Sequence, residues 1–201
     1  MAAATAASTT ALPMVTQELG FEMFPGRRLT LVVWQRVTNV AALAAAVASK
    51  SLDVALLDAA RVADTFTLAV AANKALHVHA TAVRQRATTL HAELVLCLWA
   101  GRNLADALRG LGAGADTTDI LVAVFDATPE VLDRLAAMVT VGEGGGSVAP
   151  ADYYPAGADT AWLTANYKVP AEELRVGSLA DAIVGRIAVQ EFSTGGGGAA
   201  R

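Results

Sequence analysis

The sequence predicts a single-domain α/β sandwich, in which a central, mainly antiparallel or mixed sheet of about four strands is flanked by helices. The length of 201 residues suits one domain with its own core. Short runs of β-branched and apolar residues alternate with longer segments whose apolar residues recur at helical spacing. Apolar residues make up 54% of the chain but aromatic residues only 5%, which favours a core of closely packed helices.

Four segments are expected to be strands because β-branched and apolar residues run together in them: 29–34, 54–57, 93–99 and 119–125. The third is apolar on both faces, which is typical of a central strand that is covered on both sides. Cys97 lies in this run and is expected to be an inert core residue. Because it is the only cysteine, the sequence excludes an internal disulfide framework and a cysteine-based zinc cluster.

Five segments are expected to be helices because their apolar residues have helical spacing: 40–49, 65–80, 104–111, 129–140 and 179–191. Asp64 and Asn103 precede two of them as N-caps, and Ser178, with an acidic residue three positions on, predicts a capping box on the last. Gly112 is expected to end the 104–111 helix in the left-handed conformation.

Three segments lack this periodicity. Residues 1–12 and 193–201 are expected to be disordered tails on either side of one domain, 13–192. Glycine and proline cluster in 142–157, which predicts a long loop inserted into that domain.

The charge and the absent signals limit the possible functions. A net charge of −4 argues against nucleic acid held by a general basic surface, so any such contact has to be local. No secretory signal and no apolar run of membrane-spanning length is present. We therefore expect a soluble intracellular protein without membrane contact.

The expected 65–80 helix has two different faces. One face is suited to core packing and contains Leu68, Ala71, Ala72, Ala75 and Val78. The opposite stripe contains Phe66, Val70, Asn73 and His77, beside Lys74. Apolar residues among polar ones on a solvent-facing side indicate a contact surface, and coverage by another part of the chain is the alternative.

Basic residues are concentrated in one stretch of this acidic chain: Lys74, Arg84, Arg86, Arg102 and Arg109. Arg102 and Asn103 also precede a predicted helix, whose free N–H groups favour an anion such as a phosphate. The alternative is that Asn103 only caps the helix and the arginines are solvated.

Enzymatic chemistry has one candidate group. His77 and His79 point in different directions on a helix and do not form a metal site. A stand-alone enzyme would need a pocket near His77, Thr89 and Glu93, with Glu93 as the general base. No catalytic motif accompanies them, and we expect no metal and no cofactor.

The chain from about residue 24 to 192 resembles the TPRKB (PRPK-binding protein) family, the small regulatory subunits of the KEOPS (EKC) complex. The motifs that carry the resemblance keep their order, and include Phe24-Pro25, Ala71-Ala72-Asn73-Lys74-Ala75-Leu76-His77, Asn103-Leu104, Tyr167-Lys168, Gly177-Ser178-Leu179 and Asp181-Ala182-Ile183. The chain departs from the family at Ala59 and Thr65, where its members have proline, and in the longer 142–157 segment.

The resemblance implies a compact, non-catalytic α/β subunit. It would bind and stimulate a PRPK-type kinase/ATPase at its N-lobe, and would help to dock tRNA, the 3′ CCA end included, for threonylcarbamoyladenosine formation. The implied kinase contacts are Leu179, Ile183, Ile187, Phe66 and Val70. The implied tRNA contacts are Lys74, His77, Arg84, Arg86, Arg102 and Asn103.

On its own such a subunit is expected to be a monomer that binds tRNA weakly. The broad apolar side of the last helix, which includes Leu179, Ile183 and Ile187, either closes the core or docks a partner. A small enzyme and a structural homodimer are the alternatives to the regulatory subunit.

Overall fold

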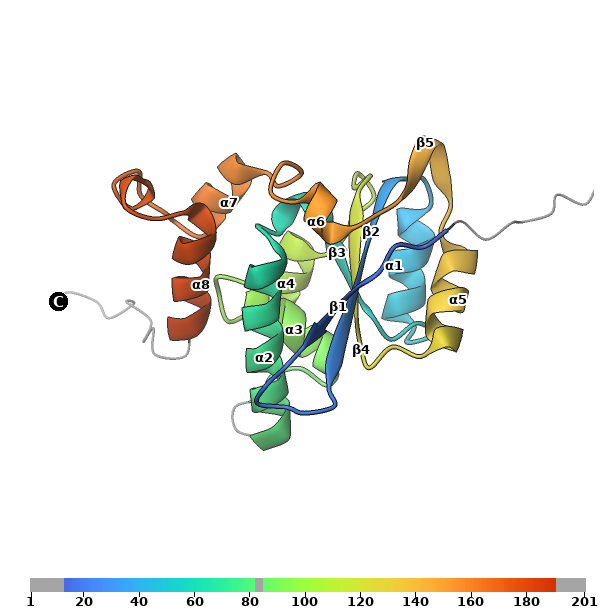
Figure 1. Cartoon of the computed structure of the whole chain (residues 1–201), viewed down its shortest axis with the longest axis horizontal. Helices are drawn as coiled ribbons and strands as arrows, with labels where there is room; N and C mark the ends of the chain where they lie inside the picture. The colour runs from blue at the N-terminus through green and yellow to red at the C-terminus, as the bar shows by residue number, and fades with distance from the viewer. Residues whose placement is uncertain (1–12, 82–84, 191–201) are drawn as a thin grey trace, which may run out of the picture.

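The computed structural model describes residues 13–81 and 85–190, which form a five-stranded sheet between two layers of helices (Figure 1). The strand order is β1-β2-β4-β3, the paired strands are antiparallel, and β5 pairs with β2. The strands are β1 (Gln17–Gly20), β2 (Arg28–Val37), β3 (Ala55–Asp58), β4 (Ile120–Phe125) and β5 (Val141–Val148). The predicted α/β fold class with a mainly antiparallel sheet is therefore confirmed.

The centre of the sheet is the pair β2 and β4, in which Leu31 lies opposite Ala123. Successive side chains of a strand point to opposite faces. In β2, Leu31 and Val33 accordingly enter one hydrophobic cluster, whereas Val32 and Trp34 enter the other. Both faces of the central strands are therefore buried, which explains their almost continuous apolar sequence.

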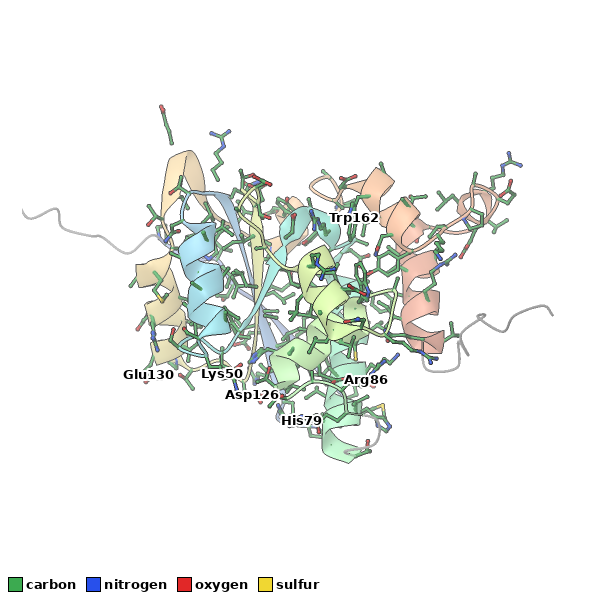
Figure 2. All side chains as sticks on the ribbon, turned by 180° about the vertical axis from the view of Figure 1, so that it is seen from behind. Lys50, His79, Arg86, Asp126, Glu130 and Trp162 are labelled. Carbon is green, nitrogen blue, oxygen red and sulfur yellow. The ribbon has the colours of Figure 1, made fainter. Side chains whose placement is uncertain are left out.

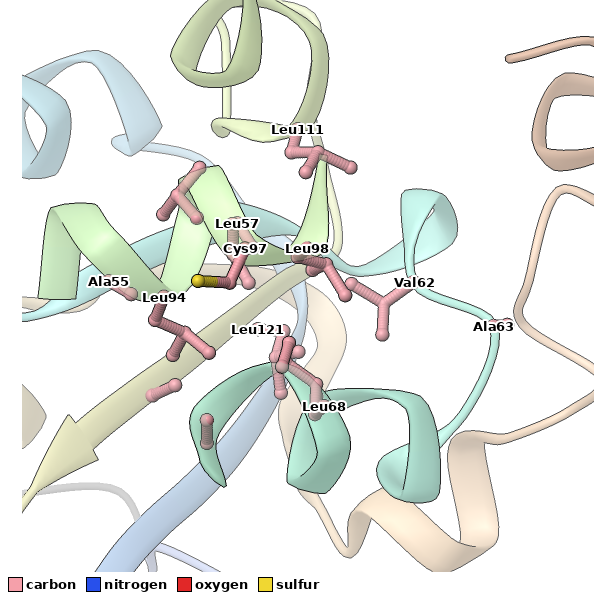
Figure 3. Packing of buried hydrophobic residues seen from close by; sticks show 14 of the residues in the cluster. Ala55, Leu57, Val62, Ala63, Leu68, Leu94, Cys97, Leu98, Leu111 and Leu121 are labelled. Atoms are coloured by element: carbon pink, nitrogen blue, oxygen red, sulfur yellow. The ribbon is translucent and has the colours of Figure 1, made fainter. Parts of the chain in front are cut away.

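Helices α1 (Val40–Ala48) and α5 (Pro129–Met138) cover one face of the sheet (Figure 1). The other face is covered by α2 (Thr65–Thr81), α3 (Leu90–Leu98) and α4 (Leu104–Leu111), and α8 (Leu179–Val189) packs against α2 from outside. Short helices α6 (Pro150–Tyr153) and α7 (Thr160–Asn166) and two 3-10 turns, η1 (Ala59–Arg61) and η2 (Glu173–Arg175), connect these layers. Figure 3 shows Cys97 in the resulting core, among Leu57, Leu94 and Leu121.

The predicted central strand 93–99 is wrong, because α3 occupies this segment. The helix is buried between the sheet, α2 and α4, so its apolar residues do not form a single stripe. A helix that is apolar all round has the same sequence pattern as a strand covered on both faces. The signal that distinguishes them is Thr89, whose Oγ1 accepts a 3.1 Å hydrogen bond from the Ala92 N–H and caps the helix.

The prediction of a long loop at 142–157 is also wrong, because β5 and α6 lie within this segment. The glycines of β5 hide its strand character, since strand prediction relies on β-branched and aromatic residues. β1 and α7 were not predicted either. Gly112 has φ of −64°, so it does not adopt the expected left-handed conformation. Glycine is required here for another reason, because a Cβ atom at this position would collide with the Leu108 carbonyl.

The remaining helix predictions are confirmed together with their caps. Asp64 Oδ1 accepts from the Thr67 N–H at 2.7 Å, Asn103 Oδ1 accepts from the Ala105 N–H at 2.8 Å, and Ser178 forms the capping box. The predicted tails 1–12 and 193–201 lie outside the described residues. No helix within the described ranges has the length and hydropathy of a membrane span.

Candidate functional site

Gln190, directly after α8, joins three helices at one point. The residue is 4% exposed, and its Nε2 lies 3.1 Å from the Leu96 carbonyl oxygen and 3.0 Å from that of Trp99, at the end of α3. Lys74 of α2 donates from Nζ to Gln190 Oε1 at 3.1 Å and to the Ile187 carbonyl at 2.7 Å. A cation at the C-terminal end of a helix is stabilised by the helix dipole.

Arg102 reaches the same junction from the α3–α4 connection, where its Nη2 donates to the Gln190 carbonyl at 3.2 Å. Lys74 and Arg102, which lie far apart in the sequence, are therefore brought together at the end of α8. The family resemblance implied both as tRNA contacts, which stays a prediction; the structure shows that each makes hydrogen bonds that hold the end of α8 in place.

Arg186 supplies a third cation and is held in place by its neighbours. Its Nη1 and Nη2 each lie 2.8 Å from a carboxylate oxygen of Glu173, and its Nε donates to the Tyr167 carbonyl at 2.6 Å. The hydrogen bonds from Arg186 lower the pKa of Glu173. Such a two-pronged pair fixes the direction of the guanidinium.

These residues surround a cavity of about 450 Å³, named here the basic cavity, which is lined by Ala100, Arg102, Asn166, Tyr167, Lys168, Arg186, Val189 and Gln190. Lys168 follows α7 with φ of 51° and is exposed. The buried Nδ2 of Asn166 has no hydrogen-bond acceptor within the described part of the chain. A buried donor without a partner is costly, so a wall with this donor and three cations is suited to an anionic or acceptor-rich ligand.

The polar and apolar stripe on α2 is a second candidate surface. Phe66 is 59% exposed, and His77 is exposed while Val70 and Asn73 are partly buried. Met23, 68% exposed, extends this surface, since its sulfur lies 3.9 Å from Asn73 Nδ2. The opposite face of α2 is buried as expected. Within residues 13–81 and 85–190, the stripe is therefore open to a partner at Phe66 and His77.

The predicted kinase contacts on α8 are corrected by their burial. Ile183 is 0% and Ile187 1% exposed, and Leu179 is partly buried against the same cluster. The apolar side of α8 closes the core by packing on α2, and it is not a surface in this conformation. Sequence reasoning missed Val176 and Leu174, which are 89% and 40% exposed just before α8. The sequence feature that could have revealed them is that both are apolar residues outside any segment with helical periodicity.

Among the predicted tRNA residues in the described ranges, Arg102 lines the basic cavity, whereas Lys74, His77, Arg86 and Asn103 are not part of its lining. Figure 2 shows Arg86 and His79 toward the end of the molecule at which α2 finishes, and Arg86 is exposed. Asn103 is occupied as the cap of α4. Arg84 lies outside the described residues. The structure thus brings Lys74 and Arg102 together at Gln190.

Glu93, the candidate general base, is 0% exposed. Its Oε2 accepts from the Ala87 N–H at 2.8 Å and from the Arg86 N–H at 3.2 Å, so it holds the connection between α2 and α3. Thr89 caps α3, and His77 is exposed on α2. The three groups do not form the open catalytic pocket that the enzyme hypothesis required, and that hypothesis loses its base.

Comparison with known proteins identifies the family. A family model described as kinase binding protein CGI-121 matches residues 34–191, from within β2 to just past α8. The EKC/KEOPS complex subunit TPRKB of Danio rerio is 26% identical over 181 residues, which cover 89% of this chain and 99% of the relative. The matched segment contains the α2 stripe and the residues of the basic cavity. The chain therefore belongs to the CGI-121 family of kinase-binding proteins.

Proposed function

We propose that this chain is a non-catalytic subunit of a KEOPS complex in the cytoplasm and nucleus. It binds and stimulates a PRPK-type kinase/ATPase and helps to dock tRNA for threonylcarbamoyladenosine formation. Family membership supports kinase binding, and the Danio rerio relative is named as a subunit of that complex. The observation that carries the docking role is the basic cavity, because it concentrates positive charge in a chain of net charge −4.

The basic cavity is suited to the single-stranded 3′ end of tRNA. Arg102 and Lys168 would face phosphates, and the Asn166 Nδ2 would donate to a base or phosphate oxygen. Unpaired nucleotides also expose the Watson–Crick edges of their bases, which paired bases use for each other. Gln190 donates from Nε2 to the Gly101 carbonyl, and its own carbonyl accepts from Arg102, so the Arg102 cation is positioned before the RNA arrives.

The proposed kinase contacts are exposed apolar side chains. Leu174 and Val176 take the place of the buried Ile183 and Ile187 at the start of α8, and Phe66, with Val70, is the second candidate on α2. Exposed apolar residues next to polar ones are typical of surfaces that bind other proteins. Separate substitutions at Val176 and at Phe66 distinguish these two candidate kinase contacts.

Kinase binding is tested with the cognate kinase subunit at micromolar concentration, by analytical ultracentrifugation and by the rate of ATP hydrolysis. We expect a complex and a faster ATPase. Val176→Glu should weaken the complex about tenfold or more if the α8 end is the contact, while Phe66→Glu should do so if the α2 stripe is. Val15→Glu, at another exposed valine, is the control. Absence of a complex would contradict the proposal.

Docking of the tRNA end is tested by comparing intact tRNA with tRNA that lacks its 3′ CCA. The proposal predicts weaker binding of the truncated RNA by the subunit and by the complex. Equal binding of both RNAs would reject this part while leaving kinase binding intact. Concentration-dependent sedimentation of the subunit alone would favour the homodimer instead.

A further inference from the structure

A second cavity of about 430 Å³ lies along the outer edge of β3, between the end of α1 and the first turns of α3 and α4. It shares no residue with the basic cavity. Its apolar lining includes Val47, Leu52, Leu56, Val95, Leu104 and Leu108. We name it the apolar cavity, and no part of the kinase or tRNA proposals uses it.

The floor and the rim of the apolar cavity differ in exposure. Leu52, Leu56 and Val95 in its wall are 4%, 9% and 3% exposed, so they belong to the packed core. Leu108 at its margin is 48% exposed, although α4 has a buried side available for a leucine. A cavity with a fixed apolar floor and an exposed leucine at its mouth gains by taking up an apolar group, because both surfaces then leave water.

A buried histidine keeps this cavity open. His91, on the first turn of α3, is 8% exposed, and its Nε2 accepts a 3.0 Å hydrogen bond from the Phe125 N–H. Because Nε2 accepts, we assign the ring proton to Nδ1, which lies 2.9 Å from Asp53 Oδ1. His91 thus ties α3 to the end of β4 and to Asp53, two residues before β3. The wall cannot collapse onto the edge strand without breaking both bonds.

The rim limits what the polar end of a ligand can be. Lys50, which follows α1 with φ of 59°, and Asp53, whose side chain is 69% exposed, place one positive and one negative charge there. The hydroxyls of Thr88 and Thr89 complete the polar lining. Because the two charges cancel, the rim favours a neutral or zwitterionic group over a net anion or cation.

We propose that the apolar cavity binds a small molecule with an aliphatic or aromatic body and a neutral or zwitterionic polar end. The body lies against Leu52, Val95 and Leu108, and the polar end faces Lys50 and Asp53. The volume falls within the range of about 300–1,000 Å³ that is usual for small-molecule sites. Walls from four separate elements enclose a concave space, which suits a compact ligand better than the flat surface of a protein partner.

The proposal is tested by methyl NMR of the full chain, titrated separately with indole as a neutral probe and L-tryptophan as a zwitterionic one. We expect saturable shifts confined to the leucine and valine methyls of the cavity. Ala92→Phe, on the α3 wall, fills the space and should weaken binding at least tenfold. Ala45→Phe makes the same change on the exposed side of α1, outside the lining, and should leave binding unchanged.

The charge of the ligand's polar end is determined with a second variant, Lys50→Gln. If the ligand class is zwitterionic, L-tryptophan binds more tightly than indole and loses this advantage, about threefold, in Lys50→Gln. If it is neutral, indole binds at least as well and is unaffected by that variant. The proposal is overturned if neither probe gives saturable shifts, or if Ala92→Phe binds like wild type. Shifts of the same methyls on adding only the kinase subunit would assign the cavity to a protein partner instead.

Discussion

Two cavities of opposite charge lie on the same small domain. The basic cavity carries Arg102, Lys168 and Arg186, whereas a cavity of about 620 Å³ beside the start of β4, here the acidic cavity, carries four carboxylates: Asp58, Asp116, Asp119 and Asp152. Net charge hides this separation, since the chain as a whole is −4. Under the proposed docking role, tRNA would be attracted to the basic cavity and repelled by the acidic cavity, so the pair would orient the RNA on the surface.

The two cavities also differ in how their charges are held. In the basic cavity, Arg186 is fixed by Glu173 and by backbone carbonyls, and Lys168 is exposed. In the acidic cavity, Asp58 accepts from the Ala60 N–H at 3.1 Å and pairs with Arg61 at 3.2 Å. Burial nevertheless raises the pKa of Asp58. Burial therefore disfavours the charged form of Asp58, whereas the hydrogen bonds to Glu173 favour the charged form of Arg186 and raise its pKa.

The largest expected effect comes from removing the support of the basic cavity. Gln190→Leu removes the buried amide that donates to the Leu96, Trp99 and Gly101 carbonyls, and it removes one acceptor of Lys74, which keeps its bond to the Ile187 carbonyl. We expect the free energy of unfolding to fall by about 2–4 kcal/mol. Gln35→Leu, which makes the same change in the lining of the acidic cavity, should cost less than about 1 kcal/mol. Urea denaturation measures both, and equal losses would show that Gln190 is not a structural junction.

Charge reversal at the rims should affect tRNA unequally. Lys168→Glu is expected to weaken binding about tenfold, equivalent to about 1.4 kcal/mol, because it places a negative charge where phosphate would lie. Asp116→Lys, in the acidic cavity, should change the affinity less than about twofold. Fluorescence anisotropy at a fixed salt concentration reports both. A larger effect of Asp116→Lys would place the RNA on the opposite cavity.

The salt dependence of tRNA affinity compares the same surfaces, and the expected effect is smaller. Each cation that neutralises a phosphate contributes roughly 1 to the slope of log affinity against log salt. Lys168→Gln should therefore lower that slope by about 1, and Lys50→Gln, far from the basic cavity, should leave it unchanged. An unchanged slope in Lys168→Gln would mean that this ammonium does not contact phosphate.

The smallest effect concerns pH and the acidic cavity. The folded-state pKa of Asp58 lies above its ordinary 3.8, first because burial disfavours the charged carboxylate. Protonation therefore favours the folded state, and this contribution is complete below 3.8 and lost as the pH rises through the raised pKa. The stability of wild type relative to Asp58→Asn should thus increase as the pH falls from neutral toward 3.8. Denaturation curves that keep a constant difference would contradict this.

Much of the fold followed from local chemistry, whereas the sites depended on tertiary contacts. Caps at Asp64, Asn103 and Ser178 are short-range features and were predicted. α3 was mistaken for a strand because burial on all sides removes the helical stripe. Helix caps can therefore be predicted from neighbouring residues, whereas the assignment of a fully buried segment to helix or strand depends on tertiary packing.

The basic cavity was predicted in part. Arg102 was found through its place before a helix, but Asn166 ends α7, which no pattern revealed, and Lys168 lies just after that helix. The roles of Lys74 and Ile183 could not be read from sequence either. Whether α8 buries its apolar side depends on how it docks on α2, more than 100 residues earlier in the chain.

The junction at Gln190 also sets an order of events during synthesis. Its bond to Lys74 spans 116 residues, and its bond to Leu96 spans 94. A ribosome that releases the chain from the N-terminus therefore exposes α2 and α3 long before the residue that ties them together. Contacts of such long range form late and slow the acquisition of the native state. Until then the side of α2 that carries Lys74 remains without its partners from α8.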